Sequence, residues 1–275
     1  MNSLTFLGTG GGRYVILTQR RYSGGLYLNL AGKEFIIDPG PGALIRALEA
    51  EKRLEKLSGV FVSHNHLDHY NDAEIMIEAM THGMKRQRGS LITTRDTLAY
   101  ISEYHRSFID IVTPSPGDFF YLEDIKVQAI PTYEHSNAIG FKFFFRGSDK
   151  AILTYSSDTA YNEELISYYR NSKVLILNVI FPSGKPIDTH LNADHALEII
   201  KKSKPELAVI THFGMQMLNA SPDLEAKRIE NLTGIRTIAA KDFMQIDLES
   251  LEISSLKRLR EKKREREKQK TLFDF

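Results

Sequence analysis

The stretch Ser63-His64-Asn65-His66-Leu67-Asp68-His69 carries the strongest chemical information in the chain. It places three imidazoles and one carboxylate within six residues, and these groups are the ligands that zinc and similar divalent cations prefer. A two-residue spacing suits an extended segment, whereas a four-residue spacing suits a helix. The stretch is therefore expected to be a loop that curls around metal ions and then enters a helix.

One short loop cannot complete two coordination spheres, and three further candidate ligands follow predicted strands elsewhere in the chain. These are His135, Asp158 and His212. A lone histidine is more often a hydrogen-bonded residue than a ligand, but the shared position after strands favours a common role. Ligands at the ends of neighbouring strands can converge at one edge of a sheet.

Apolar patterns predict strands that alternate with helices over the first 250 residues. The predicted strands are residues 3–7, 26–30, 34–37, 60–62, 125–130, 139–145, 151–154, 174–177, 207–210, 236–238 and 243–248. The predicted helices are residues 44–57, 73–80, 97–108, 193–201 and 222–231. Because no repeat or flexible linker interrupts this region, we expect one domain over residues 1–250 and a charged tail over residues 251–275.

The composition is typical of a soluble globular protein, with 42% hydrophobic and 26% charged residues among 275. No apolar run approaches the roughly 20 residues that cross a bilayer, and the first residues lack the pattern of a secretory signal. The absence of cysteine excludes disulfides, thiolate metal ligands and cysteine nucleophiles. It also fits a reducing compartment, so we expect a cytoplasmic location.

The net charge of +1 conceals an asymmetry between the body and the tail. Residues 251–275 hold nine of the 36 basic residues and five of the 35 acidic ones, which leaves 27 basic and 30 acidic residues in the body. The body therefore has no overall basic excess that would favour broad nucleic-acid binding.

Together these pieces resemble the metallo-β-lactamase-fold hydrolases over about residues 1–248. The matching residues are Asp38 in Ile36-Ile37-Asp38-Pro39-Gly40, the histidine-rich stretch, and His135, Asp158 and His212. Their order and spacing are most similar to the branch that contains ribonuclease Z and the PhnP-type phosphodiesterases. The resemblance implies an α/β (α+β) fold, built as a four-layer αββα sandwich.

The resemblance also implies how the ligands divide between two divalent metal ions. One ion is assigned to His64, His66 and His135, and the other to Asp68, His69 and His212. Asp158 would bridge the two ions, and Asp38 would orient a ligand without binding metal itself. Zn²⁺ is the expected ion, with Mn²⁺ and Fe²⁺ as alternatives.

Two such ions polarise a phosphoryl oxygen and lower the pKa of a shared water, so a metal-bridging hydroxide can replace a serine or cysteine nucleophile. Asp68 can hold that hydroxide while it ligates metal. His190, in Thr189-His190-Leu191-Asn192-Ala193-Asp194, takes the place of a further histidine in the same branch and is the candidate proton donor to the leaving group. The sequence thus predicts a dinuclear phosphodiesterase or nuclease.

One departure from the pattern of that branch qualifies this hypothesis. Many ribonuclease Z proteins carry a long insertion that grips tRNA, whereas only 32 positions separate Asp158 from His190. The short spacing counts against tRNA 3′ processing and favours a smaller phosphodiester or a nucleic acid held differently.

Hydrolysis of a lactone, thioester or other acyl substrate is the enzymatic alternative, since the fold alone cannot separate these reactions. A non-enzymatic accessory protein of the sliding clamp is the other alternative, and homo-oligomer formation is left open.

Two other patterns receive structural interpretations. The loop Gly8-Thr9-Gly10-Gly11-Gly12 lacks the remainder of a phosphate-binding P-loop, so close backbone approach near the site explains it better. The alternation of Phe141, Phe143 and Phe145 predicts a strand face in the core, not a platform for stacked bases.

The tail changes character twice. Residues 256–270 are almost entirely charged or amide residues without an apolar face, and residues 269–275 become apolar again. The final segment resembles the PIP box, the motif that binds the sliding clamp PCNA. The match would place Leu272 and Phe275 in one apolar pocket and Gln269 in a side contact, although the usual following aromatic is absent. The alternatives are a terminus that packs on the body, or a basic segment that binds nucleic acid directly.

Overall fold

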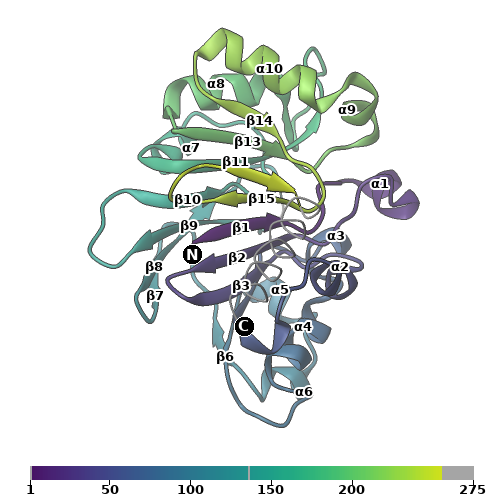
Figure 1. Cartoon of the computed structure of the whole chain (residues 1–275), viewed down its shortest axis with the longest axis vertical. Helices are drawn as coiled ribbons and strands as arrows, with labels where there is room; N and C mark the ends of the chain where they lie inside the picture. Colours follow the sequence, from purple (N-terminus) through teal and green to yellow (C-terminus); the bar gives the residue numbers. More distant parts are fainter. Residues whose placement is uncertain (1, 136, 256–275) are drawn as a thin grey trace, which may run out of the picture.

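Two β-sheets lie face to face at the centre of the molecule, and helices cover the outer side of each (Figure 1). The computed structural model describes residues 2–135 and 137–255. Each sheet is antiparallel at one end and parallel at the other. Because parallel strands end at the same edge, the loops that follow them gather on one side of the molecule.

The first sheet has the order β16-β15-β1-β2-β3-β4-β5-β6. Pairing is antiparallel from β16 to β3 and parallel from β3 to β6. Its strands are β1 (Ser3–Phe6), β2 (Leu26–Leu30), β3 (Lys33–Ile37), β4 (Leu57–Val62), β5 (Ser90–Thr93), β6 (Asp110–Val112), β15 (Met244–Asp247) and β16 (Ile253–Ser255).

The second sheet has the order β14-β13-β11-β10-β9-β8-β7, and β12 pairs with β11 beside this path. Pairing is antiparallel from β7 to β10 and parallel from β10 through β11 and β13 to β14. Its strands are β7 (Phe119–Leu122), β8 (Ile125–Pro131), β9 (Ile139–Phe145), β10 (Ala151–Tyr155), β11 (Ser172–Phe181), β12 (Leu191–Asn192), β13 (Leu207–Thr211) and β14 (Thr237–Ala239).

The helices form two groups that lie on opposite sides of the paired sheets (Figure 1). Those connected to the first sheet are α1 (Arg13–Thr18), α2 (Ala43–Glu49), α3 (Leu67–Tyr70), α4 (Ala73–Met80), α5 (Arg95–Leu98) and α6 (Glu103–Arg106), with a 3₁₀ turn at Leu54–Lys56. Those connected to the second sheet are α7 (Leu165–Tyr169), α8 (Ala193–Ser203), α9 (Met215–Ala220) and α10 (Pro222–Thr233).

Three apolar clusters show where the layers meet. The first lies between the sheets, where the Phe61 ring makes edge contacts with Phe35, Phe141 and Phe143 at centroid distances of 5.6, 5.0 and 5.3 Å. The second joins β11 and β13 to α8 and α10, and the third joins β4 to α4. Three interfaces between four layers confirm the predicted αββα sandwich, and the inward-facing Phe141 and Phe143 confirm the predicted core face.

Two predicted helices are wrong in extent. The helix predicted over residues 44–57 ends at Glu49, because Glu51 takes a left-handed φ of 56° and Leu57 already pairs with β3 as the first residue of β4. The helix predicted over residues 97–108 is two short helices. Ser102 separates them, because its hydroxyl accepts the His105 backbone N–H and starts α6 as an N-cap.

The end of the described chain differs slightly from the predicted domain boundary. Leu251 and Ile253 pack against the cluster between the sheets, and β16 pairs with β15. The first sheet therefore continues past residue 250 to Ser255, while the division into body and tail stays a prediction. The PIP-box-like residues Gln269, Leu272 and Phe275 lie outside the described residues.

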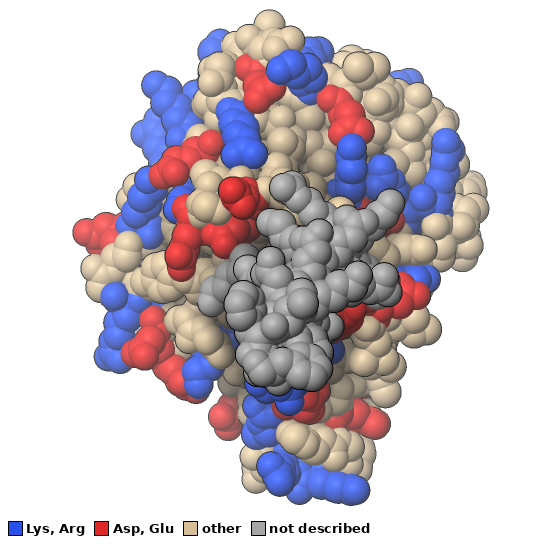
Figure 2. All heavy atoms as spheres, in the orientation of Figure 1, with Lys and Arg blue, Asp and Glu red and all other residues tan. Residues whose placement is uncertain are grey.

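The surface carries both signs of charge. On the face drawn in Figure 2, basic and acidic side chains are interspersed over most of the area, in agreement with the near balance of charge in the body. Within residues 2–135 and 137–255, no helix is both long enough and apolar enough to span a membrane.

Candidate metal centre

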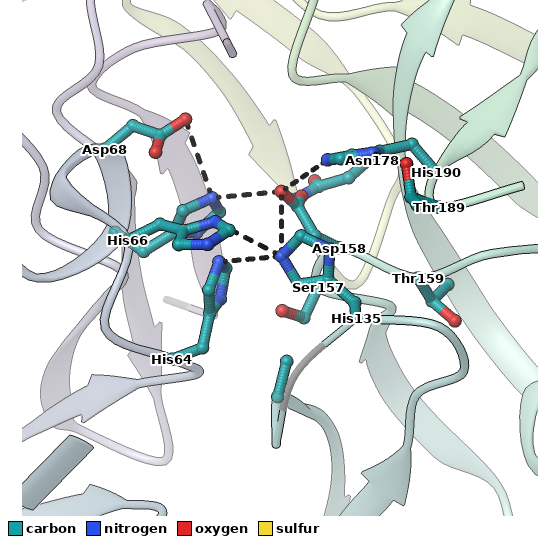
Figure 3. Close-up of polar contacts among 12 residues, drawn as sticks. His64, His66, Asp68, His135, Ser157, Asp158, Thr159, Asn178, Thr189 and His190 are labelled. Carbon is teal, nitrogen blue, oxygen red and sulfur yellow. Dashed lines mark hydrogen bonds and ion pairs between the residues drawn. The ribbon is translucent and has the colours of Figure 1, made fainter. Parts of the chain in front are cut away.

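The predicted ligands converge at the edge where the two sheets meet (Figure 3). The histidine-rich stretch follows β4 of the first sheet, whereas His135, Asp158 and His212 follow β8, β10 and β13 of the second. His66 is extended, with φ −72° and ψ 143°, and the next residue begins α3. The predicted loop that enters a helix is thereby confirmed, and α3 carries Asp68 and His69.

The first group of donor atoms belongs to His64, His66, His135 and Asp158, all within 4.8 Å of one another. His135 Nε2 lies 3.2 Å from His64 Nε2, 3.3 Å from His66 Nδ1 and 3.9 Å from Asp158 Oδ2. Three imidazole nitrogens and one carboxylate oxygen form a donor set that suits a tetrahedral divalent cation.

The second group of donor atoms belongs to Asp68, His69 and His212. His212 Nε2 lies 3.1 Å from His69 Nε2 and 3.2 Å from Asp68 Oδ2. Asp158 lies between the groups, with Oδ2 3.4 Å from His69 Nε2 and Oδ1 3.5 Å from His212 Nε2. One carboxylate thus faces both groups of donors.

Asp38 lies behind the ligands and accepts hydrogen bonds from several directions. His69 Nδ1 donates to its Oδ2 at 2.8 Å, and the Ser63 hydroxyl donates to the same oxygen at 2.7 Å. Because the Ser63 proton is used there, His64 Nδ1 donates to the Ser63 oxygen at 2.9 Å. Both histidines therefore use Nδ1 in these bonds and turn Nε2 toward their groups, the orientation that metal binding requires.

Electrostatics divide the histidines of the site into those with lowered and those with raised pKa values. Burial lowers the pKa of His64 well below its ordinary value and lowers that of His135 to about 4, so both are neutral. Burial alone would raise the pKa of Asp158, but the neighbouring His212 and His69 outweigh it and hold that pKa well below its ordinary range. Burial alone would lower the pKa of His69, but the carboxylates of Asp158, Asp68 and Asp38 outweigh it and raise that pKa well above its ordinary value. His64 and His135 therefore have the neutral state that binds a cation, whereas His69 must release a proton to do so.

The match to known proteins covers most of the chain. A beta-lactamase superfamily domain matches residues 33–213. The chain belongs to the beta-lactamase superfamily. It is 33% identical to an uncharacterized protein of Methanocaldococcus jannaschii over 257 residues, which cover 89% of this chain and 94% of that protein.

One sequence relative and one structural neighbour of this superfamily member are named after an enzymatic activity. Ribonuclease Z of Archaeoglobus fulgidus is 22% identical over 305 residues, which cover 89% of this chain and 97% of that protein. The solved structure of a diphosphatase from the PhnP family superposes with a TM-score of 0.67 at 19% identity, covering 90% of this chain and 98% of that one. The superfamily fold and the cluster of histidines and carboxylates indicate divalent metal binding.

In this superfamily member, His190 lies at the rim of the candidate metal centre. Its Nε2 is 3.5 Å from Asp158 Oδ2, its ring centroid is 4.9 Å from that of His135, and 23% of its side chain is exposed. The Thr189 hydroxyl lies 2.9 Å from His190 Nδ1 and fixes the direction of the ring. The structure therefore places His190 beside the seven predicted ligands, with Nε2 near Asp158 and the side chain partly exposed.

The glycine-rich loop lies against the ligands, as its predicted close approach requires. The Gly12 N–H donates to Asp68 Oδ2 at 3.3 Å. A Cβ on Gly11 would lie 2.2 Å from His212 Nδ1, so only glycine leaves room for that ring.

The sequence analysis missed three residues of the site. Ser63, Tyr155 and Asn178 are buried. The hydroxyls of Ser63 and Tyr155 donate to Asp38, and the amide of Asn178 donates to Asp158. Tyr155 is the last residue of β10, and Asn178 interrupts the apolar run of β11. The sequence marks both as polar residues of apolar strands, but their contact with the ligands depends on how the two strands pair.

Proposed function

We propose that this chain is a metal-dependent hydrolase of phosphodiester bonds, a phosphodiesterase or nuclease, with two divalent ions in its site. The observation that carries the proposal is the set of seven donors in two groups that share Asp158, with His190 beside them. The relatives named as a ribonuclease and a diphosphatase support phosphoryl chemistry.

The donor chemistry of the described residues fits such ions. His64, His66, His135 and Asp158 would hold one ion, and Asp68, His69 and His212 would hold the other with Asp158. Imidazole and carboxylate donors without thiolates suit Zn²⁺, and also Mn²⁺ or Fe²⁺. Bound ions would polarise the phosphoryl oxygen and lower the pKa of a coordinated water.

The chain's own residues supply the remaining steps. The Asp38 carboxylate keeps His69 in the tautomer that presents Nε2. Asp68 holds the attacking water through a carboxylate oxygen, and the Gly12 N–H fixes that carboxylate. His190 donates a proton from Nε2 to the leaving oxygen as the general acid.

The test compares substrates on protein reconstituted with Zn²⁺ or Mn²⁺. We expect turnover of bis-p-nitrophenyl phosphate, and little turnover of p-nitrophenyl acetate or of a lactone. Turnover of the acyl substrates alone would replace the phosphodiester proposal with acyl hydrolysis. Loss of phosphodiester turnover on chelation, with recovery on adding metal, is the matched control.

The role of His190 has its own experiment. His190→Gln should reduce kcat on an alkyl phosphodiester by roughly 10²- to 10⁴-fold, because an alkoxide leaves poorly without a proton. The loss should be much smaller for p-nitrophenolate, which leaves as an anion. His105→Gln on α6, where His105 contacts Ser102 and Glu78, is the control that should change neither rate. Equal losses on both substrates would remove the proton-donor role.

A further inference from the structure

Two buried polar side chains that are not members of the metal groups, Asn178 and Tyr155, form a chain of hydrogen bonds that links Asp158 to Asp38. The Asn178 amide nitrogen lies 2.7 Å from Asp158 Oδ1 and 3.1 Å from the Tyr155 hydroxyl. The Tyr155 hydroxyl lies 2.7 Å from Asp38 Oδ2. Asn178 and Tyr155 are each 3% exposed and Asp38 is 2% exposed, so bulk water does not compete for these bonds.

The chemistry of the side chains fixes which atom donates in each of these hydrogen bonds. An ionised carboxylate only accepts, so the atom of Asn178 that faces Asp158 is the amide nitrogen. The same nitrogen has a second proton for the Tyr155 oxygen. The Tyr155 hydroxyl must then donate its own proton to Asp38, since Asn178 offers it no acceptor there.

This chain of hydrogen bonds connects donors of both metal groups. At one end, Asp158 faces both groups. At the other, Asp38 orients His69 of the second group directly and His64 of the first through Ser63. A shift of any member changes the position of a ligand in each group.

We propose that Tyr155 and Asn178 are positioning residues that join the two metal sites into one preorganised unit, by fixing Asp158 against Asp38. This inference rests on the proposed two-metal site, and not on which ester bond is hydrolysed. The neutral amide at position 178 is essential to it, because an aspartate there would set a second carboxylate against Asp158.

The experiment titrates metal-free full-length protein with Zn²⁺ in competition with a chromophoric chelator. Tyr155→Phe and Asn178→Leu should lower the affinity for the more weakly bound equivalent by about 10- to 100-fold, the usual cost of losing a partner behind a ligand. Asn178→Asp should lower it at least as much. Thermal unfolding in chelator separates these effects from a loss of folding.

Tyr169→Phe is the matched control. Its hydroxyl is also fully buried but has no hydrogen-bond partner among the described residues. Removing it should leave both metal affinities unchanged.

The double variant Tyr155→Phe/Asn178→Leu adds a second criterion. Because both residues belong to one chain of bonds, its loss of affinity should match the larger single loss and not the product of the two. Unchanged affinities in the single variants, or fully independent losses in the double variant, would overturn the proposal. The phosphodiester assay on wild-type protein tests the proposed function separately, so either can fail alone.

Discussion

At the scale of single residues, His212 is held by packing where other ligands are held by hydrogen bonds. Its Nδ1 is buried without a hydrogen-bond partner in the described part of the chain, and the Gly11 backbone lies against its ring. By contrast, His69 and His64 each have a partner for the second ring nitrogen. The orientation of His212 therefore depends on the absence of a side chain at position 11.

Gly11→Ala should displace His212 and reduce metal content from two equivalents toward one. The added Cβ would lie 2.2 Å from Nδ1, a separation that requires the ring to move. Elemental analysis after dialysis against Zn²⁺ measures the effect. Gly147→Ala is the control, because φ of 80° strains it while its Cβ meets nothing within 4 Å. Two retained ions in Gly11→Ala would show that packing does not hold this ligand.

Acid should destabilise the metal-free protein through its buried histidines. Burial lowers the pKa of His135 to about 4 and also lowers that of His64. Between the unfolded value of about 6.5 and that lower pKa, the unfolded chain binds protons that the folded chain does not, so the free energy of unfolding falls as pH falls. The opposite shift of His69, whose pKa is raised, acts above pH 6.5 and not in this window.

Urea unfolding of chelated protein at pH 7, 5.5 and 4.5 measures this slope. His135→Gln should flatten it, because the glutamine does not titrate. An unchanged slope in that variant would exclude His135 as a source of the pH dependence.

At the scale of elements, α8 begins where the loop that carries His190 ends. Asn192 Oδ1 accepts the His195 backbone N–H at 2.8 Å as the N-cap, and Asn192 Nδ2 donates to the Lys185 carbonyl at 2.5 Å. One side chain thus starts the helix and ties it to the loop.

Asn192→Ala should cost about 1 kcal/mol of unfolding free energy, the usual loss for an N-cap. Asn192→Asp keeps the cap acceptor but loses the donor to Lys185, so it should be less destabilising and still lower kcat by loosening His190. Urea unfolding and the phosphodiester assay measure the two effects. Equal destabilisation by alanine and aspartate would show that the cap is not the main contribution.

Elements with a clear apolar pattern could be predicted, and elements without one could not. Long buried strands such as β9 and β13 and the amphipathic α8 were predicted because one face meets the core. β7 alternates between exposed and half-buried residues, and α1 leaves Tyr14 76% exposed and Leu17 80% exposed, so neither carries the pattern of a buried face. A buried apolar face therefore separates β9, β13 and α8 from β7 and α1, whereas the four-residue strand β5 was missed although most of it is buried.

The candidate site also contains residues that could be predicted from the sequence and residues that could not. The ligands could be predicted because a histidine or aspartate after a strand is visible along the sequence. Tyr155 and Asn178 could not, because their contact depends on the parallel register of β10 and β11, in which Tyr155 lies opposite Ile176. That register brings Asn178, two residues further along the same face of β11, to the Tyr155 hydroxyl.

At the scale of the whole molecule, the candidate metal centre lies between the two sheets. Four of its seven proposed ligands follow β4 of the first sheet, and three follow β8, β10 and β13 of the second. An ion held by ligands from both sheets links the two halves of the sandwich across their shared edge. Metal binding should therefore stabilise the fold as a whole, not only the loops that hold the ligands.

Saturation with Zn²⁺ should raise the melting temperature relative to chelated protein. Free metal at about 100 times Kd adds about 2.7 kcal/mol, because the ion binds the folded state and not the unfolded one. For a chain of this size, that corresponds to a rise of roughly 5–10 °C in Tm. Calorimetry with metal and with chelator measures the shift, and Asp158→Ala, which removes the carboxylate that faces both groups, should lose most of it. An identical Tm in metal and in chelator would show that the ions, if bound, do not tie the sheets together.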